Sequence, residues 1–342
     1  MNRVRVGFTS TGGDLVASAL IFLKNQCPNL SIHAINSGFD SVSANIAESF
    51  DVVPFGSDEE YVDQVKKVVK LRRLDFLIPW SDEEAISLSQ YLNDLEEIGC
   101  KVLVSPWPVL EQIIDKGHVY EKMKKADLRV PEYSIVTSYS EIELALKKFG
   151  FPDRAVVVKP TVGRGGRGVN IYRGNLSLED WIGSGRREQI YYLPKRADFP
   201  EKFQCSYIVM PVLNAPVFDA DVFRFRGDVQ CCYVRERVNP AGVPYRGVKL
   251  RCDQDLEQYA KSIADLFKLG SLHDIDMMTD DQGRPVLLEI NPRPSGSIAS
   301  LQSFGIPIFS NVMKIMNGGS VEWECPSHET LALAYLESCV MP

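Results

Sequence analysis

Residues 159–173, KPTVGRGGRGVNIYR, place glycines and positive charges together in a short loop between two apolar runs. Glycine permits positive φ and lets backbone N–H groups come close to a ligand, while lysine and arginine supply charge for an anion. The glycines are Gly163, Gly165, Gly166 and Gly168, and the cations are Lys159, Arg164 and Arg167. This combination predicts a site for a polyphosphate.

Several unrelated phosphate loops use these residue types, and the flanking sequence separates them. Gly163, Gly165 and Gly168 fit Gly-x-Gly-x-x-Gly, but a dinucleotide site needs a helix after the loop, and VNIYR alternates like a strand. A Walker A loop ends in Gly-Lys-Ser/Thr, whereas this loop ends in Gly-Val-Asn. A protein kinase places its lysine after the loop and carries His-Arg-Asp and Asp-Phe-Gly motifs, which this sequence lacks. The remaining interpretation is a β-hairpin flap with Lys159 on its entering strand.

A second group of polar residues lies at 273–297, HDIDMMTDDQGRPVLLEINPRPSGS. IDMMTD and PVLLEIN read as two strands, and Gln282-Gly283 is a plausible two-residue turn in which glycine supplies positive φ. The predicted pairs are Asp276 with Glu289, Asp274 with Asn291, and Ile275 with Ile290. One face of the hairpin is then acidic, and the other is apolar, with Ile275, Met277, Leu288 and Ile290.

Asp276 and Glu289 repel each other when they are directly opposed, and a divalent cation between them removes that repulsion. Two carboxylates beside an amide are ligands that suit Mg²⁺ bridging to substrate phosphates. The alternative is a solvated hairpin face with its polar residues outward, and a different turn length would also break the direct pairing. The phosphate flap upstream favours the metal site.

A basic segment, with Pro240 and Gly242 among its residues, lies between these two groups. Its cations are Arg235, Arg237, Arg246 and Lys249. The segment is either an active-site loop that closes over phosphates or a solvated basic loop. Within it, Arg237 is our candidate for a catalytic residue.

The elements that must position these residues follow from the hydrophobic pattern. Within residues 1–105, RVRVGF, SIHAIN, DVVPF, LDFLIPW and KVLVS read as strands separated by helical patterns. Such alternation predicts a parallel sheet covered on both faces, with ligands at the carboxyl ends of its strands. From residue 206 to 251 the alternation predicts an antiparallel sheet. We therefore expect an α/β chain: a doubly wound parallel-sheet domain, then an α+β module.

Composition narrows the class of protein. The formal net charge of −7 argues against a nucleic-acid or anionic-membrane partner. No stretch approaches about 18 consecutive apolar residues, and MNRVRVGFTS lacks the apolar core of a signal peptide, so we expect a cytoplasmic protein. The eight cysteines show no Cys-x-x-Cys spacing and the four histidines are scattered, which argues against a zinc site or a disulfide framework.

The order of the motifs resembles that of the ATP-grasp superfamily. An Asp-Lys pair at 115–116 opens a helix, a Val-Val-Lys-Pro strand and the glycine flap follow, and Glu-Ile-Asn-Pro-Arg closes the set at 289–293. The last motif is most similar to the carbamoyl-phosphate-synthase-like branch of carboxylate–amine ligases. The resemblance covers residues 115–316 and implies three parts: an N-terminal α/β domain at 1–110, a central subdomain with the flap at 111–203, and a subdomain with metal-binding strands at 204–342.

The resemblance also implies how the nucleotide is bound. Lys116 and Lys159 would contact ATP phosphates beneath the flap at 163–168. Backbone groups of the hinge would hold the adenine, with the candidates Met210, Val212 and Leu213. Pro211 stands where the family usually has Glu, and Asp219 is the acidic residue nearest Val217, where a ribose contact is expected.

For the reaction centre, the resemblance implies Asp276, Glu289 and Asn291 as ligands of Mg²⁺, with Mn²⁺ as another possibility. Arg293 would lie near the transferred phosphoryl group. The implied activity joins a small-molecule carboxylate to an amine through an acyl phosphate, with release of ADP and phosphate, and a homodimer is possible. Two alternatives stay open: a kinase-like enzyme that stops at a phosphorylated carboxylate or carbamate, and a nucleotide-binding regulatory protein.

Overall fold

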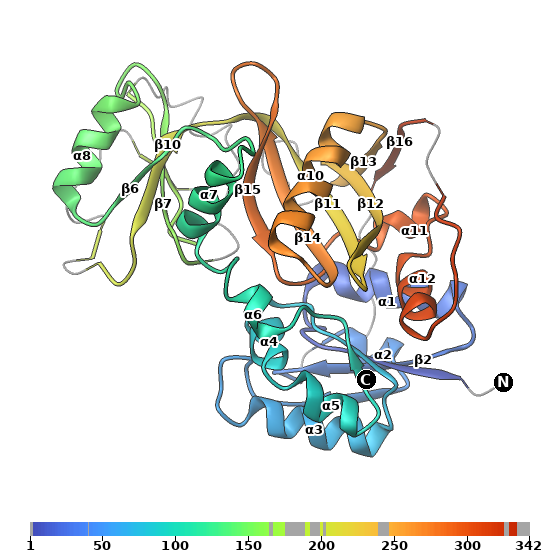
Figure 1. Ribbon diagram of the computed structural model, residues 1–342. Coiled ribbons are helices and arrows are strands. Elements are labelled where there is room, and N and C mark those ends of the chain that lie inside the picture. The colour runs from blue at the N-terminus through green and yellow to red at the C-terminus, as the bar shows by residue number, and fades with distance from the viewer. Residues whose placement is uncertain are drawn as a thin grey trace.

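The computed structural model describes residues 3–39, 41–163, 167–174, 189–191, 199–200, 203–238, 246–324 and 328–333. Their strands form three sheets, one parallel and two largely antiparallel (Figure 1). The parallel sheet comes first in the chain, and the two others follow in order. Within these ranges, no helix combines the length and apolar character needed to cross a membrane.

The N-terminal sheet has the strand order β3-β2-β1-β4-β5, and all its pairs are parallel. Its strands are β1 (Val4–Phe8), β2 (Leu30–Asn36), β3 (Ser49–Val52), β4 (Phe76–Ile78) and β5 (Lys101–Val102). The helices of this part are α1 (Asp14–Gln26), α2 (Ser43–Ile46), α3 (Tyr61–Arg72), α4 (Asp82–Ser89), α5 (Leu92–Glu97) and α6 (Trp107–Leu110). The order reverses between β1 and β4, and a doubly wound sheet has its ligand crevice at that point. The predicted parallel-sheet domain is confirmed.

The second sheet carries the predicted flap. Its order is β6-β10-β7-β8-β9, and its strands are β6 (Ser134–Val136), β7 (Val156–Pro160), β8 (Asn170–Tyr172), β9 (Gln189–Tyr191) and β10 (Tyr207–Pro211). The helices α7 (Lys116–Lys125) and α8 (Tyr139–Lys148) precede β6 and β7 respectively. Antiparallel pairing of β7 with β8 confirms the predicted hairpin. Gly168 has φ 74°, a left-handed conformation that favours glycine.

The third sheet is antiparallel throughout and has the order β15-β14-β11-β12-β13-β16. Its strands are β11 (Asn214–Phe225), β12 (Asp228–Arg237), β13 (Gly247–Arg251), β14 (Ser271–Thr279), β15 (Pro285–Asn291) and β16 (Thr330–Leu333). Helix α10 (Gln254–Phe267) packs on this sheet, and α11 (Ser300–Ser303) and α12 (Ile308–Met316) follow β15. The antiparallel pairing predicted for residues 206–251 is confirmed, although these strands belong to two sheets rather than one. Strand β10 follows residue 203 yet belongs to the second sheet, so that sheet extends past the expected subdomain boundary.

The hairpin of β14 and β15 keeps the predicted pairing at its polar end. Asp276 pairs with Glu289, and Asp274 pairs with Asn291. The turn itself is longer than predicted, because Asp280 N donates to Arg284 O at 3.0 Å and the preceding strand pair is Thr279 with Pro285. The prediction of a two-residue turn at Gln282-Gly283 is therefore wrong.

A β-bulge restores the register farther along this hairpin. The pairing shifts between Asp276 and Met277, so that Met277 faces Leu287 and Leu288 is the extra residue. A bulge of this kind changes the direction of the side chains beyond it. Leu287 is fully buried and occupies the apolar face where we expected Leu288.

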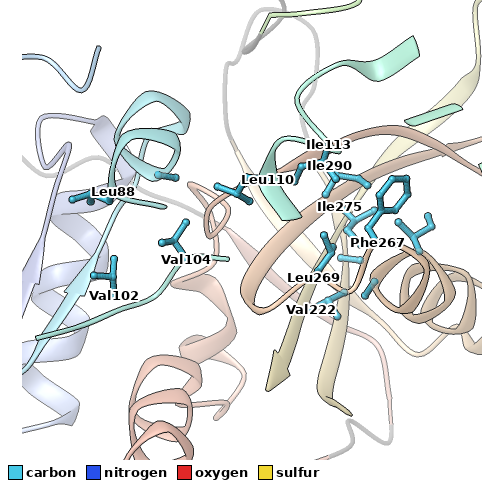
Figure 2. Close-up of a cluster of buried hydrophobic side chains, with 14 of the residues drawn as sticks. Leu88, Val102, Val104, Leu110, Ile113, Val222, Phe267, Leu269, Ile275 and Ile290 are labelled. Carbon is cyan, nitrogen blue, oxygen red and sulfur yellow. The ribbon is translucent and has the colours of Figure 1, made fainter. Parts of the chain in front are cut away.

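A continuous cluster of buried apolar side chains joins the N-terminal sheet to the third sheet (Figure 2). Leu88 and Val102 belong to the N-terminal end of this cluster, and Ile275 and Phe267 belong to β14 and α10. Leu110, after the parallel sheet, lies between the two groups in Figure 2. Since burial of apolar surface contributes roughly 25 cal/mol per Å², this shared cluster fixes the parallel sheet against the third sheet.

Candidate active site

A cavity lies between the second and third sheets. Its polar lining consists of Lys116, Lys159, Arg167, Arg237, Asp276 and Glu289, and its apolar lining includes Val157, Val169, Ile171, Val217 and Met278. The hinge residues Met210, Val212 and Leu213 also line it, and so does Gly163 at the start of the flap. A cavity with both an apolar wall and convergent charges suits a ligand that has a flat apolar part and a polyphosphate.

Lys116 owes its position to the residue before it. Asp115 is the N-cap of α7, and its carboxylate accepts hydrogen bonds from His118 N and from Thr161 Oγ1, both at 2.9 Å. Because Thr161 directly follows β7, this cap ties the start of the helix to the strand that carries Lys159. The Lys116 ammonium then lies 3.1 Å from Glu289 Oε2.

Lys159 is 7 % exposed and projects from β7 toward the bulge in β15. Its Nζ donates to the Tyr120 hydroxyl and to the Leu288 carbonyl, each at 3.3 Å. Burial lowers the pKa of Lys159 to about 8, although Glu289 and Asp276 act in the opposite direction. A buried lysine with a lowered pKa and only long hydrogen bonds is a candidate to bind the phosphate group of a ligand.

Asp276 and Glu289 are cross-strand neighbours, and both line the cavity. Burial raises the pKa of Asp276. The nearby positive charge of Arg237 acts to lower this pKa, whereas the negative charges of Asp219 and Glu289 raise it further. Asn291, 5 % exposed, donates to Asp274 Oδ2 at 3.1 Å and lies deeper in the sheet. The structure therefore brings the three predicted metal ligands together on one hairpin.

Two further carboxylates, on β11 and β14, extend this acidic group. Asp219, Asp274 and Asp276 have ligand oxygens within 4.8 Å of one another, and all three residues are buried. Neither Asp219 nor Asp274 is among the residues that line the cavity. Asp219, our candidate for a ribose contact, instead faces Asp276 across β11 and β14 and forms an ion pair with Arg237.

Arginines balance the buried carboxylates. Arg237 Nη2 lies 2.8 Å from Asp276 Oδ1 and also contacts Asp219. Arg235 is fully buried, and its Nε donates to Asp221 Oδ2 at 2.6 Å. Of the two, only Arg237 reaches the cavity, so the structure separates a buried arginine from one that a ligand can contact.

Arg293 connects the third sheet to the crevice of the parallel sheet. Its Nε donates to Asp82 Oδ1 at 2.9 Å, and its Nη1 lies 3.5 Å from Asp274 Oδ2. Asp82 begins α4, directly after β4, and the Trp80 indole nitrogen donates to Ser295 O at 3.1 Å. The side chain of Arg293 thus lies beside the β1–β4 switch point rather than in the wall of the cavity.

The donor set fits a hard divalent cation. All side-chain atoms available from Asp276, Glu289 and Asn291 for this purpose are oxygens, which Mg²⁺ and Mn²⁺ prefer over softer ligands. Among the described residues, no donor forms a hydrogen bond with the buried Asp274 Oδ1, so the acidic group holds more acceptors than these donors satisfy. Asp276 and Glu289 are the two carboxylates of this region that face the cavity.

Some predicted residues lie elsewhere or are not described. Arg164, Gly165 and Gly166 lie outside the described residues, and Gly168 belongs to the flap without lining the cavity. Tyr120 was missed, since a tyrosine within a helix carries no signal that it will contact Lys159. Asp82 was also missed, because its partner Arg293 is 211 positions away in the sequence.

Comparison with known proteins agrees with this arrangement. Residues 204–339 match a family model described as "ATP-grasp in the biosynthetic pathway with Ter operon". The large chain of carbamoyl phosphate synthase from Methanothermobacter thermautotrophicus is 20 % identical over 318 residues, covering 86 % of this chain and 28 % of that protein. The chain thus spans about a quarter of the length of the curated relatives it matches.

Solved structures show the same fold over nearly the whole chain. The biotin carboxylase domain dimer of the 2-oxoglutarate carboxylase from Hydrogenobacter thermophilus, in complex with MgADP, ADP and bicarbonate, superimposes with a TM-score of 0.67 at 16 % identity, covering 94 % of this chain and 72 % of that one. An L-amino acid ligase from Bacillus licheniformis gives 0.63 at 13 % identity, covering 92 % and 74 %. Residues 204–339 thus match an ATP-grasp family, and the chain is similar to the large chain of carbamoyl phosphate synthase.

Proposed function

We propose that this protein is an ATP-dependent carboxylate–amine ligase that forms an amide through an acyl phosphate. The observation that supports this most strongly is the convergence of Lys116, Lys159, Asp276 and Glu289 on one cavity between two sheets. Lysines that contact phosphates and carboxylates that hold a divalent cation are the parts phosphoryl transfer requires. Asp219 and Asp274 lie beside Asp276, and Asn291 donates a hydrogen bond to Asp274.

In this proposal the cavity holds ATP. The apolar wall and the backbone of Met210 to Leu213 receive the adenine, and the flap that begins at Gly163 covers the phosphates. Lys159 and Lys116 stabilise the negative charge on the transferred group, since buried point charges act more strongly than exposed ones. Because Asp219 forms an ion pair with Arg237, we assign the ribose contact to residues of the cavity wall.

Asp276, Glu289 and Asn291 would hold Mg²⁺ or Mn²⁺, which when bound supplies Lewis-acid stabilisation of the phosphoryl oxygens. While no cation is bound, Arg237 compensates the charge of Asp276. Arg237 is 32 % exposed along its side chain, whereas Arg235 is fully buried. Arg237 is therefore the arginine that can turn from these carboxylates toward a phosphoryl oxygen.

The carboxylate and amine would meet at the boundary between the cavity and the parallel sheet. Arg293 lies at this boundary, held by Asp82, and can orient a substrate carboxylate toward the phosphoryl donor. A carboxylate is a poor electrophile, and phosphorylation turns it into an acyl phosphate that an amine can attack. No His or Cys nucleophile lines the described cavity, which agrees with catalysis by positioning and electrostatics.

A test begins with ADP release, measured with small carboxylates and amines offered singly and in pairs. For an active pair, ¹⁸O-labelled carboxylate should give phosphate that carries one labelled oxygen, because the carboxylate oxygen leaves with the phosphoryl group. Release of AMP would contradict the proposal, and so would unlabelled phosphate beside an amide product. Steady ADP release without an amine would favour the kinase-like alternative, and ATP binding without turnover for any pair would favour a regulatory protein.

A further inference from the structure

We propose that Tyr120 is a positioning residue, whose hydroxyl orients the Lys159 ammonium toward the phosphates of a bound nucleotide. This inference rests on the proposed function, in which Lys159 contacts phosphates, and it adds to that site a side chain from outside the cavity. Tyr120 is fully buried in α7 and is not among the residues that line the cavity. It therefore acts on a ligand through a neighbouring side chain and not by contact.

The β-bulge in β15 determines where the Tyr120 hydroxyl lies. A bulge disrupts the ladder of hydrogen bonds between strands, and buried backbone groups that leave the ladder need other partners. The Tyr120 hydroxyl donates to Leu287 O and to Leu288 O, each at 3.1 Å. Because a hydroxyl has only one hydrogen, the two carbonyls share it. The backbone of the bulge thus fixes the position of the hydroxyl oxygen.

The same hydroxyl oxygen accepts a hydrogen bond from Lys159. Lys159 Nζ donates to it and to Leu288 O, each at 3.3 Å, and lies 5.6 Å from the centre of the Tyr120 ring, where a cation–π interaction adds to the contact. An ammonium group has three N–H donors, and these two acceptors take two of them. Since Lys159 lines the cavity, the third donor is left for a ligand there.

Helix α7 lies beside β15 (Figure 1) and contacts it with two side chains. Lys116 and Tyr120 are four residues apart, so they share one face of the helix. Lys116 Nζ lies 3.1 Å from Glu289 Oε2, and Tyr120 contacts the two residues that precede Glu289. The Tyr120 ring also packs against Tyr133, with the ring centroids 5.2 Å apart. One helix face therefore positions Lys116 directly and Lys159 through Tyr120.

A second buried tyrosine, Tyr259 of α10, contacts the same bulge and serves as a matched comparison. Tyr259 is 5 % exposed, and its hydroxyl accepts a hydrogen bond from Leu287 N at 3.0 Å and donates to Arg129 O at 2.5 Å. Both of these partners are backbone groups. Removing the Tyr259 hydroxyl disturbs the bulge but leaves both acceptors of the Lys159 ammonium in place.

ADP binding to the whole chain tests the role of Tyr120. ADP is titrated in buffer with EDTA and followed by saturation-transfer NMR, which also detects weak binding. Tyr120→Phe keeps the ring and removes only the hydroxyl, and we expect it to weaken ADP binding about fivefold. In a Lys159→Met background, the same change should alter ADP affinity by less than about twofold, because the hydroxyl then has no ammonium to orient.

Tyr259→Phe is the control variant. Both phenylalanine variants should lower the melting temperature, since each leaves a buried backbone group at the bulge without its partner, but Tyr259→Phe should keep ADP affinity within about twofold of the wild-type value. An equal loss from Tyr120→Phe with and without Lys159 would show a merely structural role and overturn the inference. Unchanged ADP affinity in Tyr120→Phe would also overturn it, and so would an equal loss in Tyr259→Phe.

These titrations contain no carboxylate or amine, so they separate this inference from the ligase proposal. If the loss in Tyr120→Phe depends on Lys159 but no carboxylate–amine pair supports ADP release, the positioning role stands and the ligase proposal fails. If a pair yields ADP and an amide while Tyr120→Phe binds ADP as the wild type does, the ligase proposal stands and the inference is wrong.

Discussion

Lys159 should make nucleotide affinity depend on pH in a window set by its burial. Its pKa is lowered to about 8, from an ordinary value near 10.4. Below pH 8 the ammonium is charged and available to phosphates. Above it, each further pH unit should weaken ADP binding by about tenfold, because the protein must then take up a proton when it binds. At pH 9 we therefore expect roughly tenfold weaker binding than at pH 7.

The stability of the nucleotide-free protein should change in the opposite direction. The folded-state pKa of Lys159 lies below its unfolded value, so the unfolded chain binds more protons between pH 8 and about 10.4, and the free energy of unfolding rises with pH in that window. The full cost of the buried charge, about 3 kcal/mol as an upper limit, is present below pH 8. Lys159→Met should therefore stabilise the protein at pH 7 while it abolishes most ADP binding.

Calorimetric titration of ADP between pH 7 and 9.5 tests this. The buffer contains EDTA, so that no metal ion binds during the titration. Metal binding would otherwise displace protons from Asp276, whose pKa is also raised, and those protons would add to the measured signal. Repeating the titration in buffers of different ionisation enthalpy should reveal proton uptake near pH 8.5, and Lys159→Arg should remove it, since arginine stays charged. Constant affinity across this range in the wild type would refute the assignment of Lys159 to the phosphates.

Three other changes probe the remaining parts of the site. Glu289→Gln should abolish turnover and should leave the melting temperature of the ligand-free protein almost unchanged. It should also remove most of the stabilisation by Mg·ATP, which at 100 times Kd is about 2.7 kcal/mol for the wild type. An undiminished thermal shift with Mg·ATP would contradict the role of Glu289. Asp82→Asn should reduce kcat at least about tenfold, because Arg293 is then held less firmly. Its ATP affinity, measured by calorimetry, should stay within about threefold of the wild-type value. A loss of ATP affinity would place Arg293 in the nucleotide site. Gly168→Val should cost about 1–2 kcal/mol in thermal unfolding because φ is 74° there, and a neutral result would mean that the flap changes conformation freely.

Local patterns predicted the parts of the fold that depend on neighbours in the sequence. The alternation of strands and helices before residue 105 determines a parallel sheet, and the Asp-Lys pair at 115–116 predicts a capped helix that presents a lysine. Each of these features is encoded within a few residues. The cap is a hydrogen bond between Asp115 and His118 N, three positions away.

The same local patterns do not predict contacts between segments that are far apart in the sequence. Arg293 and Asp82 are separated by most of the chain, and neither residue type specifies the other as its partner. Asp219 was assigned as the acidic residue nearest Val217, but strand pairing with β12 and β14 determines its environment. Such assignments need the order of strands in the sheet, which hydrophobic periodicity does not contain.

The hairpin of β14 and β15 shows how a correct pairing can follow from an incorrect turn. The turn is longer than the two residues expected, which alone would move Asp276 out of register with Glu289. The extra residue at Leu288 cancels that shift, so the two carboxylates still meet. The bulge also directs the Leu288 carbonyl to Lys159 at 3.3 Å, and Leu288 itself lines the cavity. A regular hairpin with a two-residue turn would pair the same acids but would leave Lys159 without this contact, so the irregularity that the sequence pattern concealed is part of what positions the lysine.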